Sequence, residues 1–337
     1  MPDLQTAFGY RDLTQTVQQF RFPNFWLVNQ VPSESVDGTV ASWDIERPRI
    51  DLDTNFTTLG GEAQPVAMGT YGNRTQAMPI TFKFMTLDPS KLMQARIPGT
   101  TMTRASGGGR FYVQREQSSI QRRFGAYLEE YMLWKALTGT LTITISGIST
   151  AIDYGLAASH KPTSASSWTS TSYNLLPDLT EWKRIIRKDS GMEPRWALCN
   201  QVTMNYLMAN QYVANLMGNT MYGVQLAEQG YITKFHGLTW VVLDHHYAQP
   251  GAIDRFDTPF IADGKVFILP DITSEWIALQ RGIVPIPNLA LNDVIEAVGP
   301  VMWSRVTDSP TGLTLYYKNA RLPVIRLPGA ICYATVV

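Results

Sequence analysis

The stretch Arg115–Tyr154, REQSSIQRRFGAYLEEYMLWKALTGTLTITISGISTAIDY, decides the fold class because a helical pattern in it runs directly into two strand patterns. Its first half carries apolar residues three or four positions apart, at Ile120, Phe124, Tyr127, Tyr131, Trp134 and Leu137. This spacing predicts a long helix with one apolar stripe. We expect the charged residues of the other faces to be solvated, namely Arg122, Arg123, Glu129, Glu130 and Lys135.

The second half of the stretch has the two-residue period of strands. Thr138-Gly139 is expected to end the helix, after which Leu141, Ile143 and Ile145 alternate with polar residues. A second strand is predicted through Ile152 and Tyr154. The run 136–152 lacks charge, but it is rich in Thr, Ser and Gly and short for a membrane span, so we expect no membrane segment.

Length and composition narrow the class of protein. The 337 residues exceed the roughly 250–300 at which one core stops growing, which predicts two lobes. The 28 basic and 28 acidic residues cancel, and a neutral chain lacks the field that would draw it onto DNA or an anionic membrane.

Cys199 and Cys332 are far apart, which disfavours a disulfide framework and a zinc site and favours two small buried side chains. We see no signal peptide, and expect the product to stay in the cytosol.

The N-terminal part predicts an arm and a long hairpin. A short helix over 10–20 is followed by an extended aromatic segment, 21–27, that cannot bury itself alone. Val40–Leu52 is expected to pair with Met78–Leu87. Between them, 55–76 contains four glycines and few apolar residues, which indicates an extension without a core of its own.

The second half of the chain has an α/β pattern beyond a Ser/Thr-rich connector, His160–Ser172, which we take as the boundary between lobes. The predicted elements are a helix from Pro177, a strand Trp196–Cys199, a helix capped by Asn200 with Val202, Tyr206, Leu207, Tyr212 and Val213 on its apolar face, strands at Ile232–Phe235, Leu238–Leu243 and Val266–Pro270, and C-terminal strands at Leu313–Tyr317 and Leu322–Val337. We expect the C-terminal strands to return to the sheet of the first lobe.

An enzyme is the competing reading, and its best support is Asp244-His245-His246 with His236, Asp254 and Asp257 nearby. Carboxylates and imidazoles are metal ligands, but adjacent histidines at a strand end point to opposite faces. The chain also lacks the phosphate-loop, zinc-protease and serine-hydrolase motifs. Gly107-Gly108-Gly109 is read as a flexible joint before the long helix. We therefore expect no catalytic residue, metal or cofactor.

Several short segments, taken in order, give the chain a family likeness. They are Arg21–Phe25, Val40–Arg49, Ala95–Gly99, Glu129–Met132, Leu137–Gly139, Asp153–Gly155, Ala320–Pro328 and Ala334–Val336. In this order and spacing the chain resembles the major capsid proteins of tailed phages, in the family phage major capsid protein E. None of these segments is decisive by itself.

The resemblance implies an α+β, Hong Kong 97-like capsid fold. The implied parts are an N-terminal arm (1–39), the E-loop hairpin with its base strands (40–88, tip 55–76), a P-domain (89–162) with a spine helix at 112–137, an A-domain (163–290), and C-terminal strands (291–337) that return to the P-domain sheet. One variant of the family uses a covalent cross-link from an E-loop lysine to an asparagine on a neighbour, and the first lysine here is Lys83, so we infer a shell without cross-links.

The implied function is a subunit that forms pentamers and hexamers of an icosahedral head around double-stranded DNA, without sequence-specific binding. The virion, and the host cytoplasm during assembly, are the implied locations. Implied partners are further copies, a separate scaffolding protein, a portal and a decoration protein. An encapsulin-like nanocage shell is the alternative with the same fold. The residues expected to touch neighbouring subunits are Phe22, Phe25, Trp26, Gly60, Gly61, Gly69, Tyr71 and Gly72.

Overall fold

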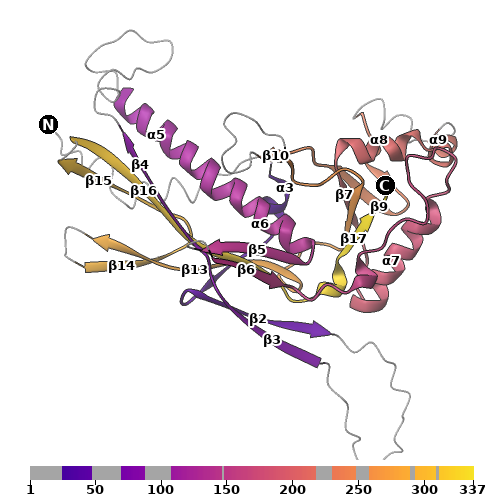
Figure 1. Cartoon of the computed structure of the whole chain (residues 1–337), viewed down its shortest axis with the longest axis horizontal. Helices are drawn as coiled ribbons and strands as arrows, with labels where there is room; N and C mark the ends of the chain where they lie inside the picture. The colour runs from indigo at the N-terminus through magenta and orange to yellow at the C-terminus, as the bar shows by residue number, and fades with distance from the viewer. Residues whose placement is uncertain are drawn as a thin grey trace, which may run out of the picture.

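The computed structural model describes residues 25–47, 70–87, 108–145, 148–217, 230–247, 258–288, 293–308 and 311–337. Figure 1 shows an elongated molecule, with a long helix lying along a long sheet at one end and a second, smaller sheet flanked by helices at the other. The arm helix predicted at 10–20 lies outside the described residues.

The long helix is continuous from Gly108 to Leu137. It consists of α5 (Gly108–Ile120), a π-helical turn η1 (Gln121–Ala126) and α6 (Tyr127–Leu137). The helix predicted at 112–137 is confirmed, although it begins earlier. Gly108 and Gly109 belong to its first turn, so the predicted flexible joint is wrong for these two residues. Gly139 ends the helix at φ +92°, where a Cβ would lie 2.8 Å from the Leu156 side chain.

The long sheet divides into two ribbons. At its root, β13 (Ile277–Asn288) pairs with β1 (Ser33–Val36) and with the C-terminal end of β16 (Thr311–Ile325). Farther along, β13 pairs with β14 (Asp293–Val298), while β16 lies between β15 (Val301–Asp308) and β4 (Ile80–Leu87). Figure 1 shows the two ribbons diverging beneath α5. The root therefore holds together elements that separate toward the tip.

Two further hairpins pack near this root. β5 (Thr140–Ile145) pairs with β6 (Ile148–Asp153), as predicted. β2 (Val40–Arg47) pairs with β3 (Thr70–Ala77), and not with Met78–Leu87 as expected. The residues of β4 alternate like those of any half-buried strand, but their partner is β16, because such a pattern specifies a face and not a neighbour.

The second lobe contains a five-stranded sheet in the order β17-β12-β7-β9-β8. Its strands are β7 (Trp196–Cys199), β8 (Lys234–Phe235), β9 (Leu238–Val242), β12 (Lys265–Leu269) and β17 (Cys332–Thr335). Its helices are α7 (Leu176–Ser190), α8 (Gln201–Ala209) and α9 (Gln211–Met217). A separate two-stranded pair, β10 (His246–Tyr247) with β11 (Thr258–Pro259), contacts α6 through Tyr247 and Tyr131. The Thr203 N–H donates to Asn200 Oδ1 at 2.9 Å, which confirms the predicted cap.

The predicted domain limits need two corrections. The last strand, β17, pairs with β12 in the five-stranded sheet and so does not return to the long sheet. In turn β13, which lies inside the predicted A-domain range, belongs to the long sheet. The helix predicted from Asn200 is divided at Asn210 into α8 and α9, and Val202 and Tyr212 of its predicted apolar face are exposed.

The end of the arm is buried in its own subunit. Trp26–Gln30 forms a short helix, α3, and Leu27 is fully buried in the main core. The prediction of an extended segment without burial is therefore wrong for 25–27, because Phe25 packs against Tyr127 of the long helix and Leu27 belongs to the main core. Burial raises the pKa of both cysteine thiols, as expected of small buried side chains. Within the described ranges, no helix is long and apolar enough to cross a membrane.

Candidate assembly surfaces and the charge cluster behind them

An aromatic face lies on the outer ribbon of the long sheet. It comprises Ile80, Phe82 and Phe84 of β4, Trp303 of β15 and Tyr316 of β16. The three β4 residues alternate along the strand and so share one side, where they are 45%, 54% and 68% exposed. Stacking continues across the strands, with the ring centroids of Trp303 and Tyr316 5.3 Å apart and those of Phe82 and Trp303 5.9 Å apart.

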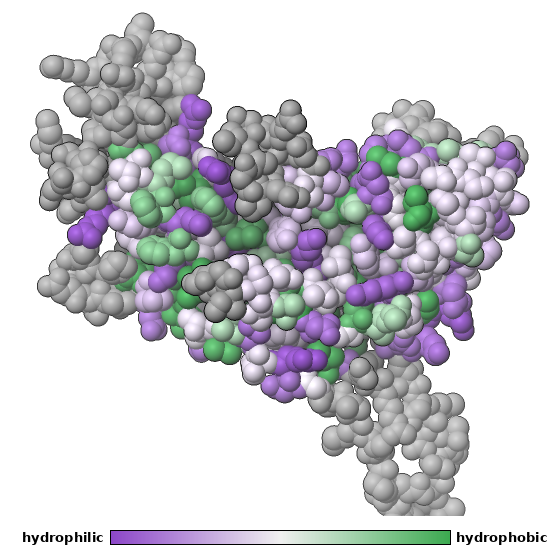
Figure 2. Space-filling model, in the orientation of Figure 1, coloured by the Kyte–Doolittle hydropathy of each residue, from purple (hydrophilic) through white to green (hydrophobic). Residues whose placement is uncertain are grey.

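The other side of the same ribbon is covered. Leu87, Val113, Ile120, Met302, Leu315 and Tyr317 form a core between the ribbon and α5. On the aromatic side, Val301 and Trp303 are buried against Ile286 of the β13–β14 ribbon. A soluble monomer rarely exposes adjacent phenylalanines, so the aromatic face has the character of a contact surface. Figure 2 shows green, apolar surface around the long sheet and α5, beside the more polar surface of the second lobe.

The β2–β3 hairpin is the second exposed feature. It forms a sheet of two strands only, and Figure 1 shows it projecting from the root. Trp43 packs inward at a ring distance of 6.1 Å from Tyr154, whereas the side chains from Gly72 to Thr75 are exposed. A two-stranded ribbon is marginally stable alone, so this hairpin gains from contact with another surface.

The predicted contact residues fall into three groups. Phe22, Gly60, Gly61 and Gly69 lie outside the described residues. Tyr71 and Gly72 lie in β3, opposite Glu46 and Ile45. Phe25 is only 4% exposed, with its ring 4.8 Å from that of Tyr127, and Trp26 packs 5.4 Å from Trp196. The side chain of Phe25 therefore packs within its own subunit. Sequence reasoning missed the aromatic face, although the alternation of Ile80, Phe82 and Phe84 with polar residues was visible.

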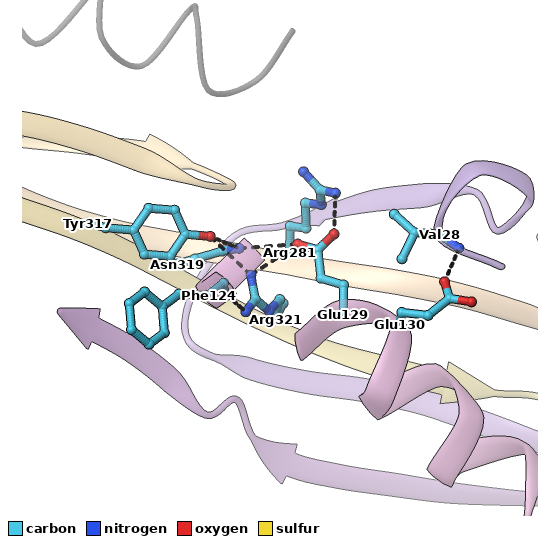
Figure 3. Close-up of polar contacts among 8 residues, drawn as sticks. All are labelled: Val28, Phe124, Glu129, Glu130, Arg281, Tyr317, Asn319 and Arg321. Carbon is cyan, nitrogen blue, oxygen red and sulfur yellow. Dashed lines mark hydrogen bonds and ion pairs between the residues drawn. The ribbon is translucent and has the colours of Figure 1, made fainter. Parts of the chain in front are cut away.

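A charge cluster lies where α6, β13 and β16 meet (Figure 3). Glu129 Oε1 accepts hydrogen bonds from Arg321 Nη1 at 3.0 Å and from Asn319 Nδ2 at 3.3 Å, and Arg281 Nη2 lies 3.4 Å from Oε2. Arg321 is completely buried and also donates to Tyr317 and to the Phe124 carbonyl in the π-helical turn. This cluster ties the helix to both ribbons.

Glu130 ties the arm to the helix. Its Oε2 accepts from the Val28 N–H at 2.9 Å (Figure 3). Its Oε1 accepts from Trp134 Nε1, also at 2.9 Å. Val28 is in the first turn of α3, so Glu130 caps that helix from outside. Burial raises the pKa of Glu130 from 4.5 to about 7. The prediction that Glu129 and Glu130 are solvated is wrong, because both carboxylates have donors in the core.

The alternative metal site does not assemble in the part of the chain that is described. There, no group of three His, Cys, Asp or Glu side chains could hold a metal. His245 packs 6.1 Å from the Phe25 ring, and His246 Nδ1 lies 3.3 Å from the Asp244 carbonyl. His236 lies on the turn between β8 and β9, and its Nε2 is 3.0 Å from Thr180 Oγ1. Asp254 and Asp257 lie outside the described residues.

The sequence profile of the family phage major capsid protein E matches residues 10–336, almost the whole chain. The chain belongs to this family. As a capsid protein it is a subunit of a multimeric shell and is located in the virion head. A comparison with curated protein sequences found no significant match.

Solved structures confirm the Hong Kong 97-like α+β fold of this capsid protein. A prophage capsid protein of E. coli CFT073 is similar with a TM-score of 0.64 and 11% identity, covering 97% of this chain and 99% of that one. The capsid protein of cyanophage P-SCSP1u gives 0.53 and 11%, covering 94% and 90%. An encapsulin of Synechococcus elongatus PCC 7942 gives 0.50 and 12%, covering 100% and 96%, so the nanocage alternative shares the fold without a better match.

Replacing Arg321 with Met should destabilise the capsid protein by about 3–5 kcal/mol, because the Glu129 carboxylate then loses its fully buried partner. Chemical denaturation of free subunits measures this. The control is Arg184→Met, which removes an exposed pair with Glu181 and should leave the midpoint nearly unchanged. Equal midpoints for the two variants would contradict the importance of the cluster.

The stability of the capsid protein should depend on Glu130. Its pKa in the folded chain, about 7, lies above the ordinary 4.5, so the folded state holds the proton more tightly. The resulting stability is complete below about pH 4.5 and is lost as the pH rises to about 7, a change of about 3 kcal/mol.

Glu130→Gln should flatten this slope, because the amide remains neutral at every pH. The control is Glu275→Gln, an exposed carboxyl, which should keep the slope. Denaturation midpoints measured from pH 5 to pH 8, roughly the range over which Glu130 changes charge, provide the test. An unchanged slope in Glu130→Gln would contradict the assignment.

Proposed function

We propose that this capsid protein forms pentamers and hexamers of an icosahedral head that encloses double-stranded DNA. The observation that supports this proposal is the aromatic face, with Phe82 and Phe84 more than half exposed on a sheet whose other side is covered by α5. Shell assembly supplies many identical neighbours, and a second copy is the natural cover for an apolar surface that every subunit carries.

The proposed contacts join projecting elements to this face. The β2–β3 hairpin buries more surface when it lies on a neighbouring subunit. The segment that joins its two strands contains Gly60, Gly61 and Gly69, which stay predicted contacts. Phe22 also stays predicted. The proposed contacts also include Trp26, Tyr71 and Gly72. Phe25 instead anchors the arm, by packing against Tyr127 of the long helix.

The proposed role is structural, without a reaction or a cofactor. The chain is neutral, with 28 basic and 28 acidic residues, which suits a wall that encloses DNA without binding a sequence. Assembly in the host cytoplasm, with a separate scaffolding protein, a portal and a decoration protein, belongs to the same proposal.

Exchanging Phe82 and Phe84 for Ser should prevent assembly without unfolding the subunit, because both side chains contribute little to its core. Electron microscopy and sedimentation velocity should show free subunits or small rings in place of closed shells. Melting temperature reports whether the fold survives.

The matched control is Tyr212→Ser on α9, a partly exposed aromatic residue outside the aromatic face, which should assemble normally. Closed shells in the doubly substituted chain, at the yield of the wild type, would contradict the proposed contact.

A further inference from the structure

His160 lies where the chain crosses between the two lobes. One crossing leads from β6 toward α7 and contains η2 (Ala158–His160); another leads from β16 to β17 and contains η3 (Pro328–Ala330). The His160 side chain is 2% exposed between these two segments and the C-terminal turn of α7. One buried imidazole therefore joins η2, in which it lies, to the end of η3 and to α7.

Both ring nitrogens of His160 face oxygen. Nδ1 is 2.7 Å from the Ile331 carbonyl, and Nε2 is 2.8 Å from Asp189 Oδ2. A carbonyl and a carboxylate only accept hydrogen bonds, while a neutral imidazole donates through one nitrogen only. Both contacts are hydrogen bonds only if both nitrogens carry a proton, as in imidazolium. Asp189 is 41% exposed, so water also reaches its carboxylate.

Among the described residues, one charged partner lies at hydrogen-bond distance from this imidazolium. Asp189 faces it from α7, and η3 presents the end of its backbone at Ile331. The strand β17 contributes no charge, since Cys332 and Tyr333 are its titratable residues and burial raises both pKa values. Lys161 is exposed, and its Nζ lies toward Gly139.

The contact between η3 and α7 leaves little tolerance for movement. A Cβ at Gly329 would lie 3.1 Å from the Asp189 carbonyl oxygen, so the two backbones approach closely beside the His160 ring. If one ring nitrogen loses its proton, a lone pair faces an oxygen at hydrogen-bond distance, which is repulsive. The pair must then separate, and the close backbone contact is lost with it.

We propose that His160 is a pH-sensitive tie that holds the two crossing segments against α7. Protonated, it makes both contacts; deprotonated, it keeps one of the two, and the packing of η2 and η3 on α7 loosens. The tie is internal to the chain, so it does not depend on the proposed assembly contacts.

Hydrogen exchange of the full chain, followed by mass spectrometry across pH, tests this proposal. The profile is measured from about pH 5 to about pH 9, which brackets the physiological range in which histidine side chains act as switches. Where the tie loosens, amides of 155–162 and 326–331 should exchange on the order of tenfold faster than the intrinsic base-catalysed rise predicts, which corresponds to about 1.4 kcal/mol. Amides of 25–31 report on Glu130 separately.

Four chains make the test specific. His160→Gln should lose the extra pH dependence, whereas the triple variant His236→Gln, His245→Gln and His246→Gln, which keeps only His160, should retain it. Asp189→Asn removes the anion and should move the loss of protection to lower pH. An unchanged profile in wild type and in the triple variant, or the same rise in His160→Gln, would overturn the proposal. If His160→Gln does not fold, the comparison of the other three chains still decides.

Discussion

The ion pair between Glu129 and Arg321 is the interaction on which the rest of this structure depends. Two charges taken out of water need hydrogen-bond partners, and Arg321 donates to Glu129, Tyr317 and the Phe124 carbonyl at once, while its Nε has no partner among the described residues. These partners belong to the long helix and to β16, and Arg281 adds β13. The pair therefore fixes the helix over the point where the sheet divides into two ribbons.

From that point, the two sides of the outer ribbon take different roles. Helix α5 covers one side with an apolar core, and the aromatic face on the other side remains open around Phe82 and Phe84. The β2–β3 hairpin also extends beyond the core of its own subunit. In an isolated subunit both features leave surface exposed to solvent, whereas a shell subunit can bury these surfaces against other copies.

Local patterns predicted the elements well and their neighbours poorly. The spacing of Ile120 to Leu137 predicted the long helix, and Asn200 predicted the N-cap of α8, because both signals lie within a few residues. Because Glu129 and Glu130 are charged, we expected both side chains to be exposed to solvent. The donors that allow their burial, Arg321 and the Val28 N–H, are far away in sequence and so were not visible in the local pattern. Strand partners failed for the same reason: alternation in β4 and β17 specifies a buried side and leaves the adjacent strand open. The aromatic face could not be predicted without knowing which side of the outer ribbon α5 covers.

Electron cryomicroscopy of shells assembled from the full chain would test the central claim most directly, because it shows what lies against the aromatic face in place. The account predicts closed shells in which a neighbouring copy covers Phe82 and Phe84, with the Glu129–Arg321 pair intact inside each subunit. Shells in which both phenylalanines face solvent, away from every neighbouring copy, would contradict it.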